Sequence, residues 1–278
     1  MHYPTTRHLL SSLHIRHLFP SRRLVRVLDP VGLATPHVGV VVRATPVNGF
    51  VGNQTFRLET RDAVYYLKAG ATVAEEAAAC QLARSVGVPA PEVIASSPLI
   101  TRELPGRPLA ADSPDLGAVL RSVGESVRRV HTIIDPSASW GDRLRGVLDG
   151  LNVLPDRLAA RVRDVAPDFI DSVASVTPAL LHGDLHLRHV YAADAELTGI
   201  LDWGDTTYGD PLFDLARVSM AGPEVMAAFL VGYGDVDAPP RTLSMYRVLW
   251  SLVALQAELA AGGDWIQPHL DVIAREIG

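Results

Sequence analysis

The chain has 278 residues, of which 48% are apolar and 20% charged, a composition that suits one large domain or two unequal lobes and excludes a disordered chain. No run of about 18 consecutive apolar residues is present, so neither a membrane span nor a signal peptide is expected. Cys80 is the only cysteine, which excludes an internal disulfide and a thiolate zinc cluster. A reducing cytoplasm is the simplest expected location.

The net charge of −6 is unevenly distributed along the chain. Residues 1–60 carry seven arginines and two acids, whereas residues 202–278 carry eleven acids and four arginines. The acidic part is either an ordinary solvated face or a field that attracts a cationic ligand. The basic N-terminal segment has no clustered aromatic residues and no known nucleic-acid-binding motif, so no nucleic-acid partner is expected.

The first part of the chain predicts a small antiparallel sheet followed by a helix. Strands are predicted over 38–47, 53–60, 63–68 and 98–104, from their β-branched residues and the turn signals between them. A helix is predicted over 72–85, because Thr72 and Glu75 have the spacing of a capping box at its start and a Gly-Val-Pro sequence follows its end. Pro105-Gly106 ends the last strand and is the expected hinge. The prediction is therefore an N-terminal lobe over 1–104 and a C-terminal lobe over 105–278.

The second lobe is predicted to be mostly helical. Apolar residues at helical spacing after a Ser-Pro start predict a helix over 113–134. Another helix is predicted to open at Asp210-Pro211, and the ranges 155–176, 240–261 and 265–276 are also predicted to be helical. Between these helices, residues 181–210 are rich in loops and carry several acids and histidines.

Lysine usage singles out one residue. Of the 25 basic side chains 24 are arginine, and Lys68 is the only lysine. An ammonium is a compact point charge that can meet phosphate oxygens and a carboxylate together, which a planar guanidinium does less well. Lys68 is therefore predicted to have a chemical role.

Two aspartates close apolar segments in the loop-rich region. Asp184 follows Leu180-Leu181 within a His-Gly-Asp-Leu-His sequence, and Asp202 follows Ile200-Leu201 and precedes Trp203. Isolated loop aspartates are commonly turn formers or caps, but turn chemistry alone does not explain this pair. One carboxylate can accept a hydroxyl proton while the second holds the metal ion that bridges two phosphates.

These residues resemble the aminoglycoside phosphotransferase family. His182-Gly183-Asp184-Leu185-His186 is similar to its catalytic loop, and Asp202-Trp203-Gly204-Asp205 with the segment from Gly209 to Ala216 is similar to its metal-binding segment and the helix behind it. The resemblance implies an α+β, bilobal, protein-kinase-like fold. It also implies ATP or GTP as phosphoryl donor, Mg²⁺, and a cationic or polyhydroxylated small molecule as acceptor.

The resemblance also implies residue roles. Asp184 is the expected base, with His182 orienting its loop, and Asp214 is expected to tie that loop down. Nucleotide contacts are expected from Lys68, its helix partner Glu76, Gly49, Gly52, and the backbone groups of Arg102 and Leu104. His189 and Asp202 are the expected metal ligands, and Asp205 and His186 the expected acceptor contacts.

One position departs from the usual family pattern. The family commonly has Asn five residues after the catalytic Asp, whereas this chain has His189, as macrolide phosphotransferases do. His189 is therefore either the second metal ligand or a brace for the loop, with water completing the metal shell. An aminoglycoside is the first candidate acceptor, and a macrolide or another small metabolite is the alternative.

Other classes of protein fit less well. The sequence has no Gly-Lys-Ser or Gly-Lys-Thr P-loop, no Gly-x-Ser-x-Gly hydrolase elbow, and no Asp-Phe-Gly to Ala-Pro-Glu activation segment. The alternative from another class is a nucleotide-binding pseudokinase without turnover. A nucleotidase assay with and without acceptors distinguishes it from an active kinase.

Overall fold

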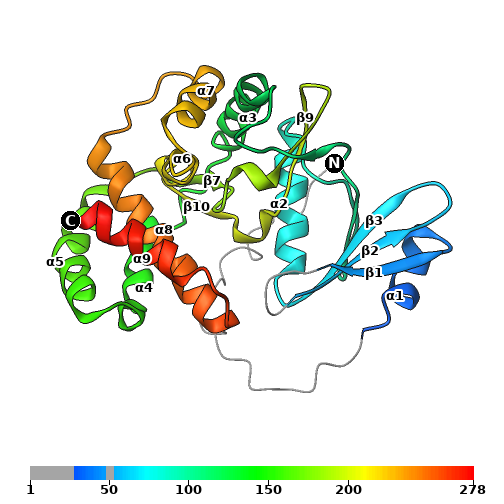
Figure 1. Ribbon diagram of the computed structural model, residues 1–278, viewed down its shortest axis with the longest axis horizontal. Coiled ribbons are helices and arrows are strands. Elements are labelled where there is room, and N and C mark those ends of the chain that lie inside the picture. The colour runs from blue at the N-terminus through cyan, green and yellow to red at the C-terminus, as the bar shows by residue number, and fades with distance from the viewer. Residues whose placement is uncertain (1–27, 48–52) are drawn as a thin grey trace.

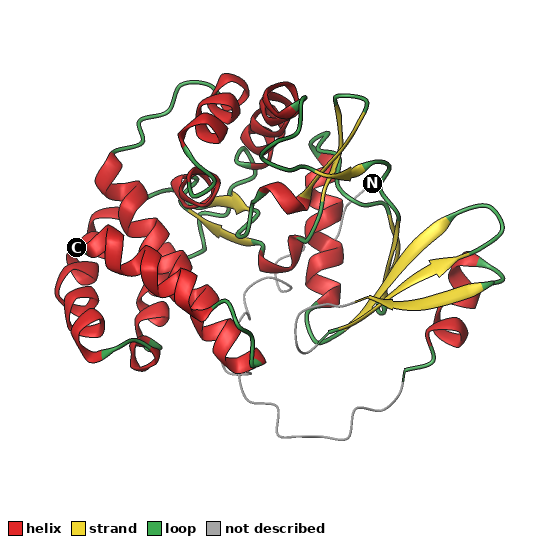
Figure 2. Ribbon diagram, in the orientation of Figure 1, coloured by secondary structure: helices red, strands yellow, loops and turns green. Residues whose placement is uncertain are grey.

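The computed structural model describes residues 28–47 and 53–278. In this part of the chain a five-stranded antiparallel sheet stands beside a mostly helical region, and helix α2 lies between them (Figure 1 and Figure 2). The expected α+β class, with a small sheet lobe and a helical lobe, is confirmed. Among the described residues no helix is both long and apolar enough to cross a membrane.

The sheet places Lys68 on one face by simple alternation. Its strands, in the order β1-β2-β3-β5-β4, are β1 (Arg43–Val47), β2 (Gln54–Glu59), β3 (Val64–Ala69), β5 (Leu99–Arg102) and β4 (Val93–Ser96). Leu67 and Ile100 are fully buried in one apolar cluster. Since successive strand residues face opposite sides, Lys68 and its cross-strand partner Leu99 face the other side, toward α2.

A helix outside the sequence prediction, α1 (Pro30–Val38), covers the face opposite α2. Its start has clear local signals: the Asp29 carboxylate accepts a hydrogen bond from Gly32 N at 3.0 Å, and Pro30 occupies the first helical position. Ala34 of this helix packs against Leu58 of the sheet. The predicted strand over 38–47 therefore begins later, at Arg43.

Helix α2 (Val73–Ser85) joins the sheet to the helical region. The predicted capping box is wrong, since the Thr72 side chain makes no capping hydrogen bond. Ala77 packs with Leu99 on the sheet side, whereas Cys80 and Ala83 belong to the core of the helical region. Small side chains on both sides of the helix allow this close approach. As a result Glu76, in the first turn, comes within reach of Lys68.

Seven further helices and several short strands build the rest of the described chain. The helices are α3 (Leu116–Val130), α4 (Trp140–Leu148), α5 (Asp156–Val173), α6 (Leu212–Ser219), α7 (Pro223–Tyr233), α8 (Pro240–Ala261) and α9 (Ile266–Ile277). Short strands are β6 (Arg107–Pro108), β7 (Ala179–Leu181), β8 (Val190–Ala193), β9 (Glu196–Ile200) and β10 (Thr207–Gly209), with 3₁₀ turns at η2 (Leu151–Val153), η3 (Leu187–His189) and η4 (Trp203–Asp205). Of these helices, α4 and α7 lie outside the sequence prediction.

Two apolar clusters hold these helices together. In the first, α3 packs so closely on α7 that a Cβ on Gly124 would lie 2.1 Å from Phe229 O. The second cluster is built around Trp140, Phe213 and Tyr246, whose rings meet edge to face or tilted. Because β7 is fully buried and pairs with β10 between these clusters, the loop that follows β7 starts from a rigid base.

Candidate active site

A buried aspartate fixes the start of the loop after β7. Asp214, on α6, is fully buried and accepts hydrogen bonds from the backbone nitrogens of His182 at 2.8 Å and Gly183 at 2.9 Å. Gly183 has a φ of 88°, and a Cβ there would lie 2.2 Å from Asp205 O, so only glycine fits. Asp214 therefore ties the loop down, as expected.

The Asp214 carboxylate is itself part of a buried network. His131 Nε2 lies 3.1 Å from Asp214 Oδ2, and His131 Nδ1 lies 2.8 Å from Tyr233 Oη. Burial opposes ionisation of Asp214, but the hydrogen bond from His131 and the nearby histidine and backbone donors outweigh it and lower the pKa of Asp214. The anchor of the loop is thus a buried, ionised carboxylate.

His182 joins the loop to the strand that leads to Asp202. Its Nε2 donates to Leu201 O at 2.8 Å, and its Nδ1 accepts from Asp184 N at 3.3 Å. This pair of bonds defines a neutral imidazole, and burial lowers the pKa of His182 in agreement. Leu201 N in turn donates to His189 O at 2.7 Å. His182 is placed to orient the loop rather than to react.

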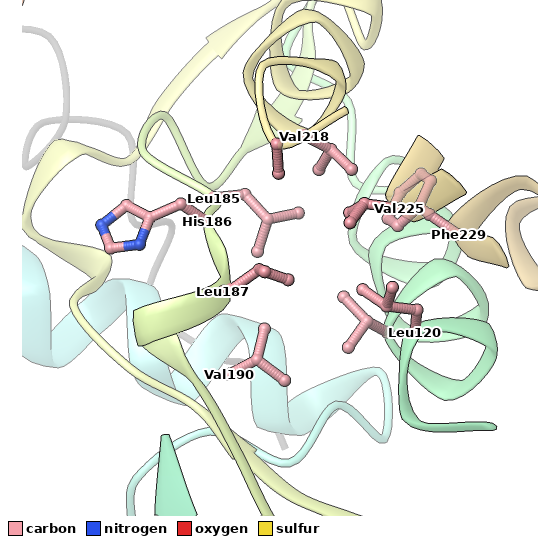
Figure 3. A pocket seen from close by; sticks show the side chains of 10 residues that line it. Leu120, Leu185, His186, Leu187, Val190, Val218, Val225 and Phe229 are labelled. Carbon is pink, nitrogen blue, oxygen red and sulfur yellow. The ribbon is translucent and has the colours of Figure 1, made fainter. Parts of the chain in front are cut away.

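Apolar packing holds the side of the loop opposite Asp184. Leu185 and Leu187 point into a small apolar pocket that is also lined by Val218 and Phe229, as Figure 3 shows. His186 lies between these two leucines in sequence and points away from the pocket in the same view. Alternation of apolar and polar residues thus leaves His186 on the Asp184 side of the loop.

Asp184 has two unlike carboxylate oxygens. Oδ1 accepts a hydrogen bond from Arg217 Nε at 2.8 Å, while Oδ2 lies 3.6 Å from His186 Nε2. His186 Nδ1 accepts from Arg188 N at 3.2 Å, so the ring hydrogen is on Nε2, toward Asp184. Burial, with His189 and Arg217 nearby, lowers the pKa of His186 to about 2, so this ring is neutral.

Lys68 lies between two carboxylates. Its Nζ is 2.7 Å from Glu76 Oε2 and 3.2 Å from Asp202 Oδ1. Burial acts to lower the pKa of Lys68, but Asp202 and Glu76 outweigh it and raise the pKa. The expected pairing of Lys68 with Glu76 is thus present, and the lysine also contacts Asp202.

Asp202 adopts a strained backbone conformation. Its φ and ψ are 60° and 65°, in the left-handed region that non-glycine residues seldom occupy, and such strain is concentrated at functional sites. The turn directs the carboxylate at both Lys68 and His189. Burial opposes ionisation of Asp202, but the charge and hydrogen bond of Lys68 act against it and the pKa of Asp202 is lowered.

The donor atoms between His189 and Asp202 fit a metal ion. His189 Nδ1 lies 2.9 Å from Asp184 O and must carry the ring hydrogen, because a carbonyl only accepts. The lone pair is then on Nε2, which faces Asp202 Oδ2 at 3.5 Å. Two acceptor atoms that face each other at this distance fit a divalent cation bound to both.

Another potential ligand set, Asp184, His186 and His189, has its donor atoms within 4.8 Å of one another. The ring nitrogens that face the Asp184 carboxylate are His186 Nε2 at 3.6 Å and His189 Nδ1 at 3.9 Å. Both carry the ring hydrogens assigned above, so neither offers a lone pair there. His189 and Asp202 are the better pair of ligands.

Asp205 completes the acidic side of the site. Its side chain is open to solvent but surrounded by protein, and this desolvation, together with the like charges of Asp184 and Asp202, raises the pKa of Asp205 to about 6. Arg143 of α4 and Lys68 act in the opposite direction. Asp205 is therefore a carboxylate near Asp184 and Asp202 with a raised proton affinity.

The remaining nucleotide contacts named from the sequence are placed only in part. Arg102 donates its backbone N–H to Glu92 O at 3.0 Å, and its side chain pairs with the Glu92 carboxylate at 2.7 Å. That N–H is committed to the sheet, while Leu104 follows β5 where the chain leaves it and packs against Gly199. Gly49 and Gly52, like the basic residues 1–27, lie outside the described residues.

Sequence reasoning missed three residues that surround the loop: Arg217, Trp250 and His131. Arg217 could have been found, since it lies three residues after Asp214 on α6 and therefore on the same helix face. Trp250, whose Nε1 donates to Gly183 O at 3.1 Å, and His131 come from distant helices and carry no local signal.

A small antiparallel sheet with a lysine on its central strand, joined to a helical lobe with a His-Gly-Asp loop, defines the kinase-like class of proteins. Residues 43–245, well over half of the chain, match the phosphotransferase enzyme family known as APH. The chain belongs to this family and is a phosphotransferase that acts on a hydroxyl acceptor.

Solved structures with the same fold support this assignment. A thermostable mutant of the aminoglycoside phosphotransferase APH(4)-Ia, in ternary complex with ADP and hygromycin B, is 20% identical, with a TM-score of 0.69 over 90% of this chain and 99% of that one. The macrolide 2′-phosphotransferase MphH from Brachybacterium faecium is 20% identical, with a TM-score of 0.61 over 89% and 96%. A mutant of the aminoglycoside 2′-phosphotransferase IIIa in complex with GDP is 18% identical, with a TM-score of 0.68 over 88% and 94%.

Proposed function

We propose that this enzyme transfers the γ-phosphoryl group of ATP or GTP to a hydroxyl of an antibiotic, with an aminoglycoside as the first candidate. The observation that carries the proposal is the position of His189, which contacts Asp184 O through Nδ1 and faces Asp202 through Nε2. One side chain thus joins the group that would accept a proton to the group that would hold the metal.

In this proposal Asp184 is the general base. Its Oδ1 is occupied by Arg217, which leaves Oδ2 to accept the proton of the acceptor hydroxyl while the hydroxyl oxygen bonds to the γ-phosphorus. The bond between that phosphorus and the oxygen of the nucleoside diphosphate breaks as the new bond forms. His182 and Asp214 hold the loop still during the transfer.

Lys68 binds the α- and β-phosphates of the donor in this scheme. Glu76 keeps the ammonium oriented, since their ion pair is the shorter of the two contacts of Lys68, 2.7 Å against 3.2 Å for Asp202. Gly49 and Gly52 are proposed to cover the phosphates, and the backbone of Leu104, with Arg102 beside it, to meet the purine. Nucleotides bound in the similar structures include ADP and GDP.

Asp202 and His189 would hold Mg²⁺. Bound there, the ion would supply electrostatic stabilisation by neutralising negative charge that develops on the phosphates of the donor during transfer. The strained turn at Asp202 and the hydrogen bond from His189 Nδ1 orient the two ligand atoms before any ion binds.

Asp205 and His186 are the proposed acceptor contacts. The Asp184 charge is already paired with Arg217, so Asp205 is the carboxylate best placed to attract an ammonium group. This favours an aminoglycoside. His189, where the family commonly has Asn, favours a macrolide as the second candidate acceptor.

A phosphorylation screen tests the proposal. The enzyme is supplied with Mg²⁺ and either ATP or GTP, together with hygromycin B, other aminoglycosides, macrolides, cyclic peptide antibiotics or simple alcohols. Phosphate transfer to an antibiotic is expected, and transfer to none of them, with no nucleotide hydrolysis, would favour the pseudokinase alternative. For a cationic acceptor kcat/KM should fall steeply with ionic strength, since exposed charges are screened over about 8 Å at physiological salt.

A further inference from the structure

An arginine that the sequence did not single out lies directly behind the proposed base. Arg217, on α6, is 13% exposed, and its Nε donates to Asp184 Oδ1 at 2.8 Å. The guanidinium carbon lies 4.0 Å from the ring centroid of Trp250, on α8. Arg217 therefore has its charge paired on one side and its planar face covered on the other.

Trp250 also binds the loop itself. Its Nε1 donates to Gly183 O at 3.1 Å, one residue before Asp184. The hydrogen bonds from Arg217 and Trp250 thus reach adjacent residues of the loop from two helices that pack together. Any rotation of the Asp184 side chain must break the first bond, and any shift of the Gly183 carbonyl must break the second.

The environment of Arg217 is costly for a charge. Desolvation lowers the pKa of Arg217, and Asp184 acts against that effect. Replacing a buried ion pair by apolar residues is often neutral or stabilising, so a contribution to folding stability does not explain why Arg217 is paired with Asp184. Control of the position of Asp184 explains the pair better, because a misplacement of about 1 Å can cost about 10²-fold in rate.

We propose that Arg217, packed over the ring of Trp250, is a positioning residue that binds Oδ1 of Asp184 and so presents Oδ2 to the acceptor hydroxyl. The inference rests on the proposed role of Asp184 as the base. It adds that the orientation of the base is set from α6 and α8, outside the His-Gly-Asp loop.

The test is the pair of variants Arg217→Ala and Arg247→Ala. Arg247 is a matched control, since its side chain is 19% exposed, its guanidinium pairs with Glu276 at 2.7 Å, and it contacts Ser219 of α6 rather than Asp184. Turnover is measured with Mg²⁺ and ATP, using the antibiotic that is phosphorylated fastest, and also as ATP hydrolysis, in which water is the acceptor.

Arg217→Ala should lower kcat by about 10- to 10²-fold and change the KM for ATP by less than about 2-fold, because geometry rather than nucleotide binding is lost. Millimolar guanidinium chloride should restore much of this kcat by filling the space between Asp184 and Trp250, whereas methylammonium chloride at the same ionic strength should not. Arg247→Ala should show no guanidinium-dependent recovery.

A double-mutant cycle with Asp184→Asn decides whether Arg217 acts through the base. If it does, adding Arg217→Ala to Asp184→Asn should change kcat by less than about 2-fold, since residues that act as a unit are not additive. Trp250→Phe keeps an aromatic ring beside Arg217 but loses the hydrogen bond to Gly183 O, so it should lower kcat less than Arg217→Ala does. If Arg217→Ala does not fold, Arg217→Lys takes its place in the cycle, since lysine keeps the charge without a planar face for Trp250.

Fully additive losses, or equal recovery of the Arg247→Ala control by guanidinium, would overturn the inference. Normal turnover of Arg217→Ala beside a strongly impaired Asp184→Asn would overturn it while leaving the proposed function in place. Normal turnover of Asp184→Asn itself would overturn the proposed function, and this inference with it.

Discussion

The two halves of the site are held in different ways. The loop that carries Asp184 is anchored by buried contacts: Asp214 is fully buried and accepts two backbone hydrogen bonds, and Leu185 is packed in the core. The other half, Lys68 with Glu76 and Asp202, is held by ion pairs, and the Asp202 side chain is 49% exposed. The difference separates a part of the site that is built into the core from a part that is held mainly by charge.

The largest expected effect concerns Asp184, the proposed base on the rigid half. Asp184→Asn removes the proposed proton acceptor but leaves Asp214 and the packing of the loop intact, so kcat should fall by about 10²-fold or more, the usual scale for general acid–base catalysis. Nucleotide KM should stay within about 2-fold, because Lys68 and Asp202 are untouched. Steady-state kinetics with the acceptor identified in the screen provides both values, and an undiminished kcat would remove Asp184 from this role.

Replacing Asp214, which anchors the rigid half, should lower the free energy of unfolding. Asp214→Asn places an amide NH₂ against a group of donors, so one of them loses its acceptor and unfolding should become easier by about 1–3 kcal/mol. Urea unfolding of wild type and variant at pH 7 measures this difference. A loss confined to activity, with unchanged stability, would contradict the anchoring role.

The same variant has a defined pH dependence. The folded pKa of Asp214 is lowered, so its ionised form contributes stability above the ordinary pKa of about 3.9, and that contribution is lost as pH falls further toward the folded pKa. The difference in stability between wild type and Asp214→Asn should therefore be constant near neutral pH and shrink below about pH 4. A difference that grows on acidification would show that the folded pKa is not lowered.

In the half of the site held by ion pairs, a positive charge at position 68 should not be sufficient for nucleotide binding. Lys68→Arg keeps the charge but cannot place a compact ammonium between Glu76 and Asp202, so kcat/KM for the nucleotide should fall by about 10-fold, nearly as far as in Lys68→Ala. Nucleotide titrations with both variants measure this. Wild-type behaviour of Lys68→Arg would show that the scarcity of lysine in the chain carries no functional meaning.

The smallest expected effect tests whether His189 is a metal ligand or only supports the loop. Imidazole nitrogen suits Mn²⁺ better than Mg²⁺, whereas an amide oxygen suits Mg²⁺, so His189→Asn should lower the Mn²⁺/Mg²⁺ activity ratio by a few-fold. The ratio is measured for both proteins at saturating metal. Identical ratios would leave His189 as a brace that only bonds to Asp184 O.

Local patterns predicted a large part of the fold. The range 240–261 was predicted as a helix and matches the bounds of α8, because the local signal of a long helix extends over many turns. Helix α1 was missed although Asp29-Pro30 is a helix start, since the β-branched residues just after it favoured a strand. Short helices such as α4 were missed because they have few turns over which a sequence pattern can repeat.

The sequence by itself determined which side chains carry the proposed chemistry. Asp184 and Asp202 each end an apolar segment, and Lys68 is the only lysine, so contiguous residues and composition were sufficient to find them. The tertiary structure decided what holds these groups: Lys68 meets Asp202 across 134 residues, Asp184 meets Arg217 across 33, and Gly183 meets Trp250 across 67. Such contacts depend on which face each helix turns toward the loop, and that is set by packing of the whole core rather than by any local pattern.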